Sequence, residues 1–345
     1  MQCDIIIPVW NKKDLTKRCI ENIVKNTRCP YKLIIIDNAS DSPTKDYLES
    51  LKENEELEIK LIRNEENLGN TKAVNQGIKA SDAPFVCILD NDTVVCDGWL
   101  HEMIAVANSD KSIGIVNPSS NTLGVSPKSN SQEGIEKCAE ECKEFRGQKV
   151  EIGACVGFCS LVKREVIEKI GGWDEAFSPG YFDDTEYSYR AYKAGHKSVC
   201  AKAAYVYHNE HSSFKDTNLR ELFKEKRQLY YEKVGKPKRI LYVLTKKNIA
   251  LHNKIKEKSY KLASEINWVM IYIKSSLPDL KMTKHGRIGI SQITSFLFRL
   301  RCIFRILVKK KKYTNVYVDD NILYNLLRKL TKFHKAEVEL IKENE

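Results

Sequence analysis

Apolar residues in the first ninety positions form short runs that alternate with polar segments of helical spacing. The apolar runs lie at 5–9, 31–36, 57–62 and 84–89, and the helical patterns cover 14–25, 44–54 and 67–80. Strands that feed helices in this order predict a doubly wound, mostly parallel sheet with helices on both faces, which is an α/β fold. Ligands of such sheets bind at the carboxyl ends of the strands. We therefore expect the functional residues to lie in the loops that follow the strands.

The most informative of these loops is Asp90-Asn91-Asp92, which follows the apolar run 85–89. Side chains of a strand alternate with period two, so both carboxylates leave the strand on the same face. Two buried like charges repel each other, and a hard divalent cation carrying a phosphate group would stabilise the pair. An acidic turn is the alternative, because Asp and Asn are ordinary turn residues. Asp37 and Asp41 favour the metal site, since they follow another strand and would lie on the same edge of the sheet.

Further segments are expected to complete this half of the chain. The small apolar residues of 153–158 predict a strand that a ligand could approach closely. A helix over 164–170 should end at Gly171-Gly172, a common signal for a helix C-terminus. The acidic run 183–186 begins another helix, where it would also favour the helix dipole. A strand over 198–207 then delivers His208 at its end.

The second half of the chain repeats the alternation with a basic composition. Residues 1–214 hold 26 Lys and Arg against 33 Asp and Glu, whereas residues 215–345 hold 31 against 13. A charged segment over 216–236 predicts a helical linker. Strands at 239–244, 268–273, 313–318 and 336–341, with helices at 250–266, 290–308 and 322–333, predict a smaller, Rossmann-like α/β domain over 237–345. Because the chain stops soon after a strand, we expect this domain to be truncated.

The expected helix 290–308 has an apolar seam and a strongly basic end. The seam is formed by Ile290, Ile293, Leu297, Leu300, Phe304 and Leu307, and the helix runs into four consecutive lysines, Lys309–Lys312. A core helix with a solvated basic end is the interpretation that we favour. A basic amphipathic helix on an anionic membrane surface is the alternative. The positive charge of this half indicates an anionic surface as its partner.

The overall composition excludes several classes of protein. An apolar fraction of 42% supports packed cores and argues against disorder. No window offers the ~20 uninterrupted apolar residues of a membrane span. The chain enters a buried strand at once, which argues against a signal peptide, and its eleven scattered cysteines are expected to be reduced thiols. These features favour a cytoplasmic location, at the inner face of the membrane if the basic half binds lipid.

Several motifs in this order resemble glycosyltransferase family 2, in particular its rhamnosyltransferase-like branch with the GT-A fold. The resemblance covers residues 3–215 and rests on 6–11, 37–41, 67–70, 75–77, 90–92, 172–175 and 182–186, followed by Arg190 and His208. Trp10 stands where the family usually has Tyr, and Asp183-Asp184 stands where it usually has Glu-Asp. The resemblance implies the GT-A nucleotide-diphospho-sugar transferase fold for a domain over 1–215. The basic domain weakly resembles the N-terminal half of a GT-B glycosyltransferase.

The resemblance also implies a reaction, the inverting and metal-dependent transfer of a sugar in cell-envelope polysaccharide synthesis. The donor would be a nucleoside-diphosphate sugar with dTDP or UDP, and the acceptor a hydroxyl of a glycan or a lipid-linked acceptor. Mn²⁺ or Mg²⁺ would be held by Asp92 and His208, with His211 as a weaker alternative to His208. Asp184 would be the general base, with Asp183 as the alternative.

Donor and acceptor would contact two further sets of residues. Donor contacts are expected at Pro8, Val9, Asn11, Asp37, Asn38, Ser40, Asn67, Gly69, Asn70, Asn75, Asp90 and Asn91. Among these, the carboxylate of Asp37 could accept a hydrogen bond from the ring N–H of a pyrimidine base. Acceptor contacts are expected at Gly157, Trp173 and Asp174, although a Trp beside a Gly-Gly turn is also typical of a core aromatic residue.

Three other functions compete with this hypothesis. A nucleotidyltransferase would need a Gly-rich phosphate loop with a Lys near the N-terminus, which residues 8–11 do not provide. A catalytically silent GT-A module that binds carbohydrate or acts as a scaffold is disfavoured because Asp92, Asp184 and His208 are all present. Nucleic-acid binding would rest only on the basic second half, which carries no recognisable motif, so we expect no nucleic-acid partner.

Overall fold

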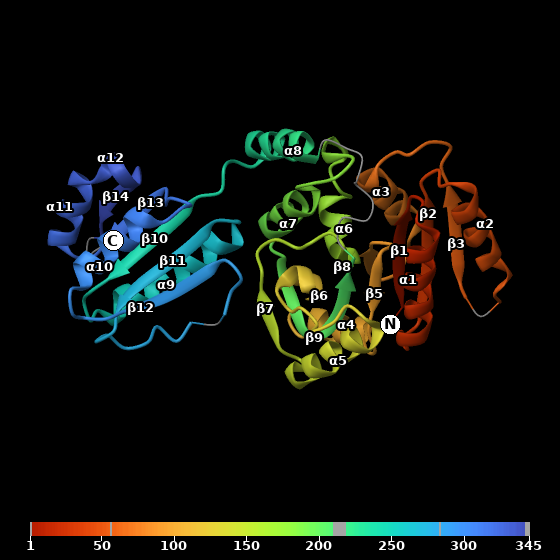
Figure 1. The fold of residues 1–345 in the computed structure, drawn as a ribbon, viewed down its shortest axis with the longest axis horizontal. Helices are drawn as coiled ribbons and strands as arrows, with labels where there is room; N and C mark the ends of the chain where they lie inside the picture. The colour runs from red at the N-terminus through yellow and green to blue at the C-terminus, as the bar shows by residue number, and fades with distance from the viewer. Residues whose placement is uncertain (1, 56, 210–218, 283, 342–345) are drawn as a thin grey trace. The chain divides into compact units, whose positions relative to one another are not determined.

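The computed structural model describes residues 2–55, 57–209, 219–282 and 284–341. The chain divides into two compact units, residues 1–234 and 235–345, and each is built on its own sheet (Figure 1). The described part of the predicted linker 216–236 begins at residue 219 and forms a helix of the first unit.

The sheet of the first unit has a parallel half and a mixed half. Its strands are β1 (Cys3–Val9), β2 (Tyr31–Asp37), β3 (Ile59–Arg63), β4 (Phe85–Leu89), β5 (Thr93–Val95), β6 (Ile113–Ser119), β7 (Lys149–Glu151), β8 (Cys159–Lys163) and β9 (Lys197–His208). They follow the order β3-β2-β1-β4-β8-β6-β9-β5, and β7 pairs with β9. The first four in this order are parallel, whereas β8 is antiparallel to both of its neighbours. The predicted α/β fold with a doubly wound sheet is therefore confirmed.

Helices cover both faces of this sheet. They are α1 (Lys13–Asn26), α2 (Ser42–Ser50), α3 (Asn70–Ala80), α4 (Trp99–Asn108), α5 (Gln132–Cys142), α6 (Arg164–Ile170), α7 (Asp183–Lys193) and α8 (Leu219–Lys233). Alternate residues of β1 show the two layers, because Ile5 and Ile7 join a core with α1, α2 and α4, whereas Ile6 joins a core with α3, α6 and α7. This alternation is why β1 is apolar along its whole length.

One predicted strand of this unit is wrong. Residues 153–158 form a loop, and the strand begins at Cys159, which pairs with Leu89 of β4. Side chains satisfy the backbone of this loop in place of a neighbouring strand. Asn117 bonds both N–H and C=O of Val156, and the Ser188 hydroxyl accepts from the N–H of Cys155. The apolar sequence of the loop reflects its burial and not its pairing.

The second unit is an all-parallel sheet with helices on both faces. Its strands are β10 (Arg239–Leu244), β11 (Trp268–Lys274), β12 (Ile288–Ile293), β13 (Asn315–Val318) and β14 (Glu337–Leu340), and its helices are α9 (Ile249–Ser264), α10 (Phe298–Val308), α11 (Asn321–Lys329) and α12 (Thr331–His334). The strand order β12-β11-β10-β13-β14 is the 3-2-1-4-5 order of Rossmann-type sheets. The predicted second α/β domain is therefore present.

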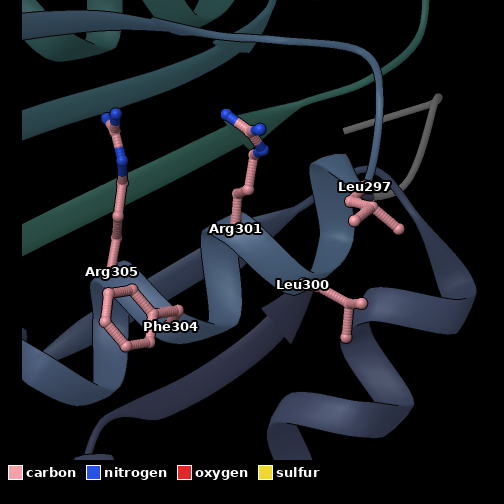
Figure 2. Close-up of a pocket in the computed structure, with 5 residues that line it drawn as sticks. All are labelled: Leu297, Leu300, Arg301, Phe304 and Arg305. Atoms are coloured by element: carbon pink, nitrogen blue, oxygen red, sulfur yellow. The ribbon is translucent and has the colours of Figure 1, made fainter.

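The single helix predicted over 290–308 is wrong in two respects. Its first part is the strand β12, where Gly289 lies so close to β11 that an added Cβ would be 2.7 Å from Cε of Met270. Its second part is α10, which buries Phe298, Cys302 and Ile306. The apolar seam expected to face the core instead points outward at Leu300 and Phe304 (Figure 2).

Two bulk expectations can be compared with the structure. Within the described ranges, no helix is long and apolar enough to cross a membrane. The eleven cysteines are free thiols, nine of them buried and two, Cys29 and Cys200, half-buried.

Candidate active site

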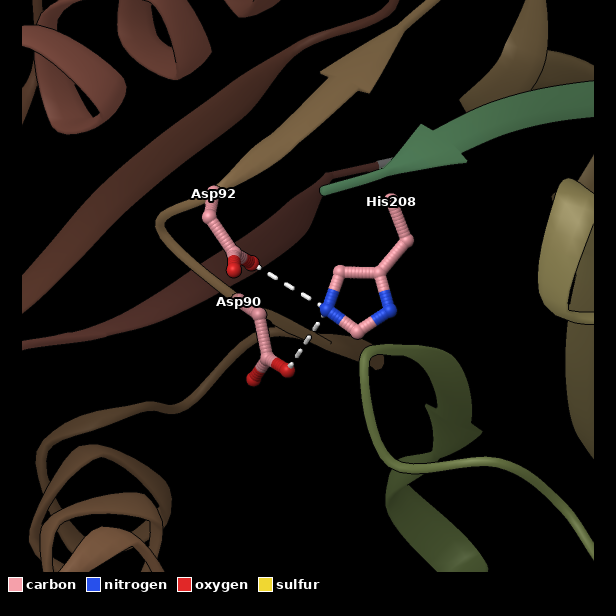
Figure 3. Close-up of side chains that lie close together, drawn as sticks. All are labelled: Asp90, Asp92 and His208. Carbon is pink, nitrogen blue, oxygen red and sulfur yellow. Dashed lines mark ion pairs between the residues drawn. The ribbon is translucent and has the colours of Figure 1, made fainter. Parts of the chain in front are cut away.

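Asp90, Asp92 and His208 meet at the carboxyl edge of the first sheet. The two carboxylates follow β4, and His208 ends β9, where it pairs with Thr93 of β5. Nε2 of His208 lies 3.2 Å from Oδ1 of Asp92 and 3.7 Å from Oδ2 of Asp90 (Figure 3). One ligand atom from each residue lies within 4.8 Å of the others, so the three side chains could hold one metal ion.

Neighbouring side chains fix the orientation of this triad. Asn121 accepts from the backbone N–H of His208 and donates to its C=O, both at 2.9 Å. The Phe158 ring stacks on the imidazole with ring centroids 5.0 Å apart. Between the two carboxylates, Asn91 donates from its amide to Oγ1 of Thr16 at 2.8 Å. Such supporting contacts are what hold metal ligands in one geometry.

The electrostatics of the triad favour a bound cation. Burial raises the pKa of Asp90 to about 6, with a further contribution from the charge of Asp92, while His208 acts in the opposite direction. A raised pKa in an acidic pair means that the fold alone does not fully compensate its charge. Carboxylate oxygens suit Mg²⁺ and Mn²⁺, and an imidazole nitrogen is an accepted ligand of transition metals. The donor set therefore fits a divalent cation.

Asp183 and Asp184 open α7 and have different surroundings. Asp184 is half-buried, and its Oδ2 accepts from the N–H of Gly157 at 3.0 Å while its Oδ1 accepts from the N–H of Thr185 at 2.6 Å. Asp183 is buried, and its Oδ2 accepts from the hydroxyl of Thr71 at 2.9 Å. Burial and then the charge of Asp184 raise the pKa of Asp183 to about 7. Asp184 is thus the more accessible carboxylate of the two.

The loop before β8 joins Asp184 to the metal triad. Gly157 donates to Asp184, and the next residue, Phe158, accepts from the N–H of Asp90 at 2.8 Å and stacks on His208. The charge of Asp184 also contributes to the raised pKa of Asp90. A general-base candidate and a metal-site candidate therefore lie on two sides of one short backbone segment.

Gly157 and Trp173, two of the predicted acceptor residues, lie side by side. A Cβ at Gly157 would be 3.4 Å from the Trp173 ring and 3.7 Å from Asp184. Trp173 is only 3% exposed and packs near Tyr187 in the core, as its alternative interpretation expected. Its indole N–H is buried without a hydrogen-bond partner among the described residues.

Helix α8 holds the segment that leads into Asp183. Tyr181 and Phe182 have φ of 73° and 65°, a conformation that aromatic residues rarely adopt. The Phe182 ring lies 5.2 Å from that of Phe223 and 5.4 Å from that of Tyr230, both on α8. This aromatic contact stabilises an otherwise costly turn directly before the two carboxylates.

Asp174, the third predicted acceptor residue, is engaged by the protein. Its carboxylate forms an ion pair with Lys233 of α8 and accepts from the N–H of Ala176. Helix α8 therefore contacts both ends of the segment 174–182, through Lys233 at Asp174 and through the aromatic cluster at Phe182.

Asp37, at the end of β2, lies in a second polar cluster on the same edge. Its buried carboxylate pairs with Arg63 and accepts from the N–H of Ser40 at 2.9 Å. The Ser40 hydroxyl in turn accepts from the N–H of Asn11, which follows the buried residues Pro8 and Val9 of β1. Asp41 is used differently, because it caps α2 by accepting from the N–H of Thr44.

The other predicted donor residues join this cluster to α3. The Asn38 side chain accepts from the N–H of Leu68 and donates to Oδ1 of Asn67 at 2.8 Å. Gly69 has φ of 84°, and a Cβ there would lie 2.4 Å from Oγ of Ser178. Asn70 donates from its backbone to the carbonyl of Pro179 at 3.3 Å.

Asn75 and Arg190 form hydrogen bonds with the turn around Gly172. The Asn75 amide bonds both N–H and C=O of Trp173 at 2.8 Å. The Arg190 guanidinium pairs with Glu186 and donates to the carbonyl of Gly172. Both side chains therefore fix the backbone of Gly172 and Trp173 by hydrogen bonds.

Sequence reasoning missed four residues that take part in this arrangement: Arg63, Thr71, Asn121 and Phe158. Arg63 directly follows the predicted strand 57–62, so the expectation that functional residues follow the strands could have identified it. The others depend on loops whose course no local pattern shows. His211, the weaker alternative ligand, lies outside the described residues.

An α/β sheet with a potential metal triad and a neighbouring carboxylate at its carboxyl edge is typical of nucleotide-sugar transferases of the GT-A type. Residues 4–171 match the family model described as Glycosyl transferase family 2. This part of the chain belongs to that family and is a glycosyltransferase domain.

Curated relatives and solved structures agree with this assignment. Poly-beta-1,6-N-acetyl-D-glucosamine synthase of Staphylococcus aureus strain MSSA476 is 24% identical over 174 residues, which are 49% of this chain and 41% of that protein. The match thus spans less than half of that relative's length. TarS 1–349 of S. aureus, solved with UDP-GlcNAc, has a TM-score of 0.51 at 16% identity and covers 68% of this chain and 66% of that one.

GalNAc-T7, solved with UDP, GalNAc and Mn²⁺, has a TM-score of 0.50 at 16% identity, covering 67% of this chain and 50% of that one. At such low identity, the two structural likenesses establish the fold and nothing finer. The GT-A fold predicted for the first half of the chain is confirmed by them.

Proposed function

We propose that the first unit transfers a sugar from a nucleoside-diphosphate donor to a hydroxyl of a glycan or a lipid-linked acceptor, with inversion at the anomeric carbon and with a divalent metal. The observation that supports this most is the loop at Gly157 and Phe158. It joins the carboxylate of Asp184 to Asp90 and His208, so a base and a diphosphate-binding centre would face one reacting sugar.

The donor would be held through its nucleotide and its diphosphate. Asp92 and His208, with a share from Asp90, would hold Mn²⁺ or Mg²⁺, which when bound offsets the negative charge developing on the leaving diphosphate. Asp37 would accept from the ring N–H of the base, and its pairing with Arg63 would hold the carboxylate in one orientation. UDP-sugars and dTDP-sugars both carry such an N–H.

Asp184 would act as the general base. The acceptor hydroxyl donates its proton to the Asp184 carboxylate while its oxygen attacks the anomeric carbon and the bond to the diphosphate breaks. Hydrogen bonds from Gly157 and Thr185 hold the carboxylate in place, so little reorganisation is needed. Attack from the face opposite the diphosphate inverts the configuration. Gly157, Trp173 and Asp174 would border the acceptor.

A panel of nucleotide sugars tests this proposal. UDP-GlcNAc comes first, because a matching relative is named as an N-acetylglucosamine polymer synthase, followed by UDP-glucose, UDP-galactose and dTDP-rhamnose. We expect one donor to raise the unfolding temperature and to be hydrolysed slowly, in both cases with Mn²⁺ or Mg²⁺ and not with EDTA. Metal-dependent stabilisation without hydrolysis or transfer would indicate a catalytically silent module, and the absence of any donor effect would refute the proposal.

A further inference from the structure

Helix α10 of the second unit has two apolar faces, and only one of them packs in the core. Phe298, Cys302 and Ile306 form the buried face. On the opposite side Leu300, Phe304 and Val308 repeat every four residues and are 59%, 66% and 59% exposed. We call these three residues the outer stripe. A second apolar stripe is not needed to fold the unit, and large exposed apolar patches usually mark a binding surface.

The outer stripe lies in the most basic part of the chain. Between Leu280 and Val318 the sequence has ten Lys and Arg residues and no Asp or Glu. Four of them, Lys309–Lys312, follow the stripe directly. Of the described residues, none forms an ion pair with Arg301, Lys310 or Lys311.

Apolar and cationic groups also line one groove on this helix. It has a volume of about 380 Å³ and is formed by Leu297, Leu300, Arg301, Phe304 and Arg305. Figure 2 shows both arginines extending from α10 in the same general direction, with Leu300 and Phe304 beside them. Arg305 is partly used by the fold, since it donates to Oγ of Ser291 at 2.6 Å.

We propose that the outer stripe and the lysine run dock the second unit on the surface of a membrane that contains anionic lipids. Leu300, Phe304 and Val308 would enter the boundary between headgroups and acyl chains, while Arg301 and the lysines would contact lipid phosphates. Helices that lie in this interface combine an apolar stripe with Lys and Arg in the same way. The charges of Arg301 and of the lysine run are complementary to an anionic surface, whereas Arg299 at the start of α10 is paired with Asp320.

The same features disfavour a protein partner on this surface. Lys is depleted in protein–protein interfaces, yet four lysines continue this stripe. A second copy of the chain would bring two such basic clusters together, and their repulsion would oppose association. The inference does not rest on transferase activity, although a lipid-linked acceptor would suit a protein bound at a membrane.

Vesicle flotation with the full chain tests the proposal. Vesicles of phosphatidylcholine alone are compared with vesicles in which about one third of the lipid is phosphatidylglycerol, at low and at high salt. We expect flotation with the anionic vesicles at low salt, weaker flotation at high salt because charges are screened, and none with phosphatidylcholine alone.

Two variants separate the apolar and the cationic contributions. The double variant Leu300→Ser/Phe304→Ser should bind anionic vesicles at least tenfold more weakly. The triple variant Arg301→Gln/Lys310→Gln/Lys311→Gln should lose roughly fivefold per charge, hence about 100-fold. The matched controls are Val24→Ser/Ile249→Ser, two exposed apolar positions on other helices, and Lys247→Gln/Lys254→Gln/Lys261→Gln, at the start of α9 and along it. Both controls should bind like the unchanged protein.

Four outcomes would overturn the proposal. Equal binding to both kinds of vesicle, or no binding to either, would remove the anionic surface as the partner. Loss of binding in the triple variant but not in the double variant would indicate a general polyanion effect without docking of the outer stripe. A change from dimer to monomer in the double variant, measured by sedimentation, with vesicle binding unchanged, would assign the stripe to self-association.

Discussion

Two acidic pairs occupy equivalent positions in the two sheets and have different environments. Asp90 and Asp92 follow β4, and Asp319 and Asp320 follow β13. In the first unit β3, β2, β1 and β4 are neighbours in parallel, and in the second unit β12, β11, β10 and β13 follow the same order. Each acidic pair therefore follows the fourth strand of its unit, and that strand lies beside the first strand of the same unit.

The second pair is neutralised by donors of its own fold. Asp319 is buried and accepts from the N–H and the hydroxyl of Thr245, at 2.8 and 2.7 Å, and from the N–H of Lys246 at 3.0 Å. Asp320 pairs with Arg299 and caps α11 by accepting from the N–H of Leu323.

The first pair instead faces an imidazole and a further carboxylate. Asp90 and Asp92 meet His208, but burial and the charge of Asp92 still raise the pKa of Asp90. Of the residues that the structure describes, only these three form a cluster of potential metal ligands. A carboxylate at a strand end therefore indicates a binding site only where the surrounding loops supply ligands and like charges, and not where they supply hydrogen-bond donors.

The largest effect should come from Asp184, the carboxylate for which the second unit has no counterpart. Asp184→Asn should slow transfer by roughly 10²–10⁴-fold, because an amide cannot take the proton of the acceptor. Donor affinity, measured by calorimetry with Mn²⁺, should stay nearly unchanged. The control is Asp183→Asn, which should slow transfer less, since Asp183 contacts Thr71 and is buried. Full activity of Asp184→Asn with an inactive Asp183→Asn would exchange the two roles.

The acidic pairs themselves can be compared by Asp92→Asn and Asp320→Asn. Asp92→Asn should weaken metal-dependent donor binding by at least roughly 100-fold, because it removes a charged ligand from the triad. Asp320→Asn should leave donor binding unchanged. Calorimetry in Mn²⁺ and in EDTA measures both, and equal affinities of the unchanged protein with and without metal would contradict the metal site.

Asp319→Ala tests the structural half of the comparison. The substitution removes a buried carboxylate and leaves the N–H groups of Thr245 and Lys246 without their acceptor, which should lower the free energy of unfolding of the second unit by about 1–3 kcal/mol. Denaturant unfolding, monitored by the hydrogen exchange of backbone amides in β10 and β13, measures this loss of stability. Donor binding by the first unit should not change, and a weakened donor affinity would mean that the second rim also has a binding role.

The two acidic pairs also show which parts of the fold and of the site can be predicted from the sequence. Alternation of strands and helices predicted both sheets, and position after a strand, together with the family motifs, predicted Asp90, Asp92 and Asp184 as site residues. Asp319-Asp320 has nearly the same local sequence signal as Asp90-Asn91-Asp92. What separates them is Thr245, some seventy residues away in the chain, whose backbone and hydroxyl approach only after folding.

The errors have the same physical origin. Residues 153–158 were expected to form a strand because they are apolar, but Asn117 and Ser188 satisfy their backbone from distant elements. Helix α10 was expected to bury the seam that includes Phe304, whereas a second apolar stripe at Cys302 takes that place. A local pattern shows that residues are apolar, but not which of two faces the core will use.

The smallest expected effect is the pH dependence that Asp183 gives to the stability of the first unit. Asp183 has a folded-state pKa of about 7 against 3.8 in its ordinary state, so the folded first unit retains a proton that the unfolded chain releases. Its contribution to stability is fully present below about pH 4 and is lost as the pH rises through 7. In EDTA, the free energy of unfolding of the first unit should therefore fall by about 1–2 kcal/mol more between pH 6 and pH 8 in the unchanged protein than in Asp183→Asn. Tryptophan fluorescence suits the measurement because Trp10, Trp99 and Trp173 lie in the first unit and only Trp268 in the second.

The Asp319→Asn variant serves as the control and should keep the pH dependence of the unchanged protein in that transition. Identical pH profiles for the unchanged protein and Asp183→Asn would show that the proton is not held at Asp183. The electrostatic difference between the carboxylates of the two units would then rest on Asp90 alone.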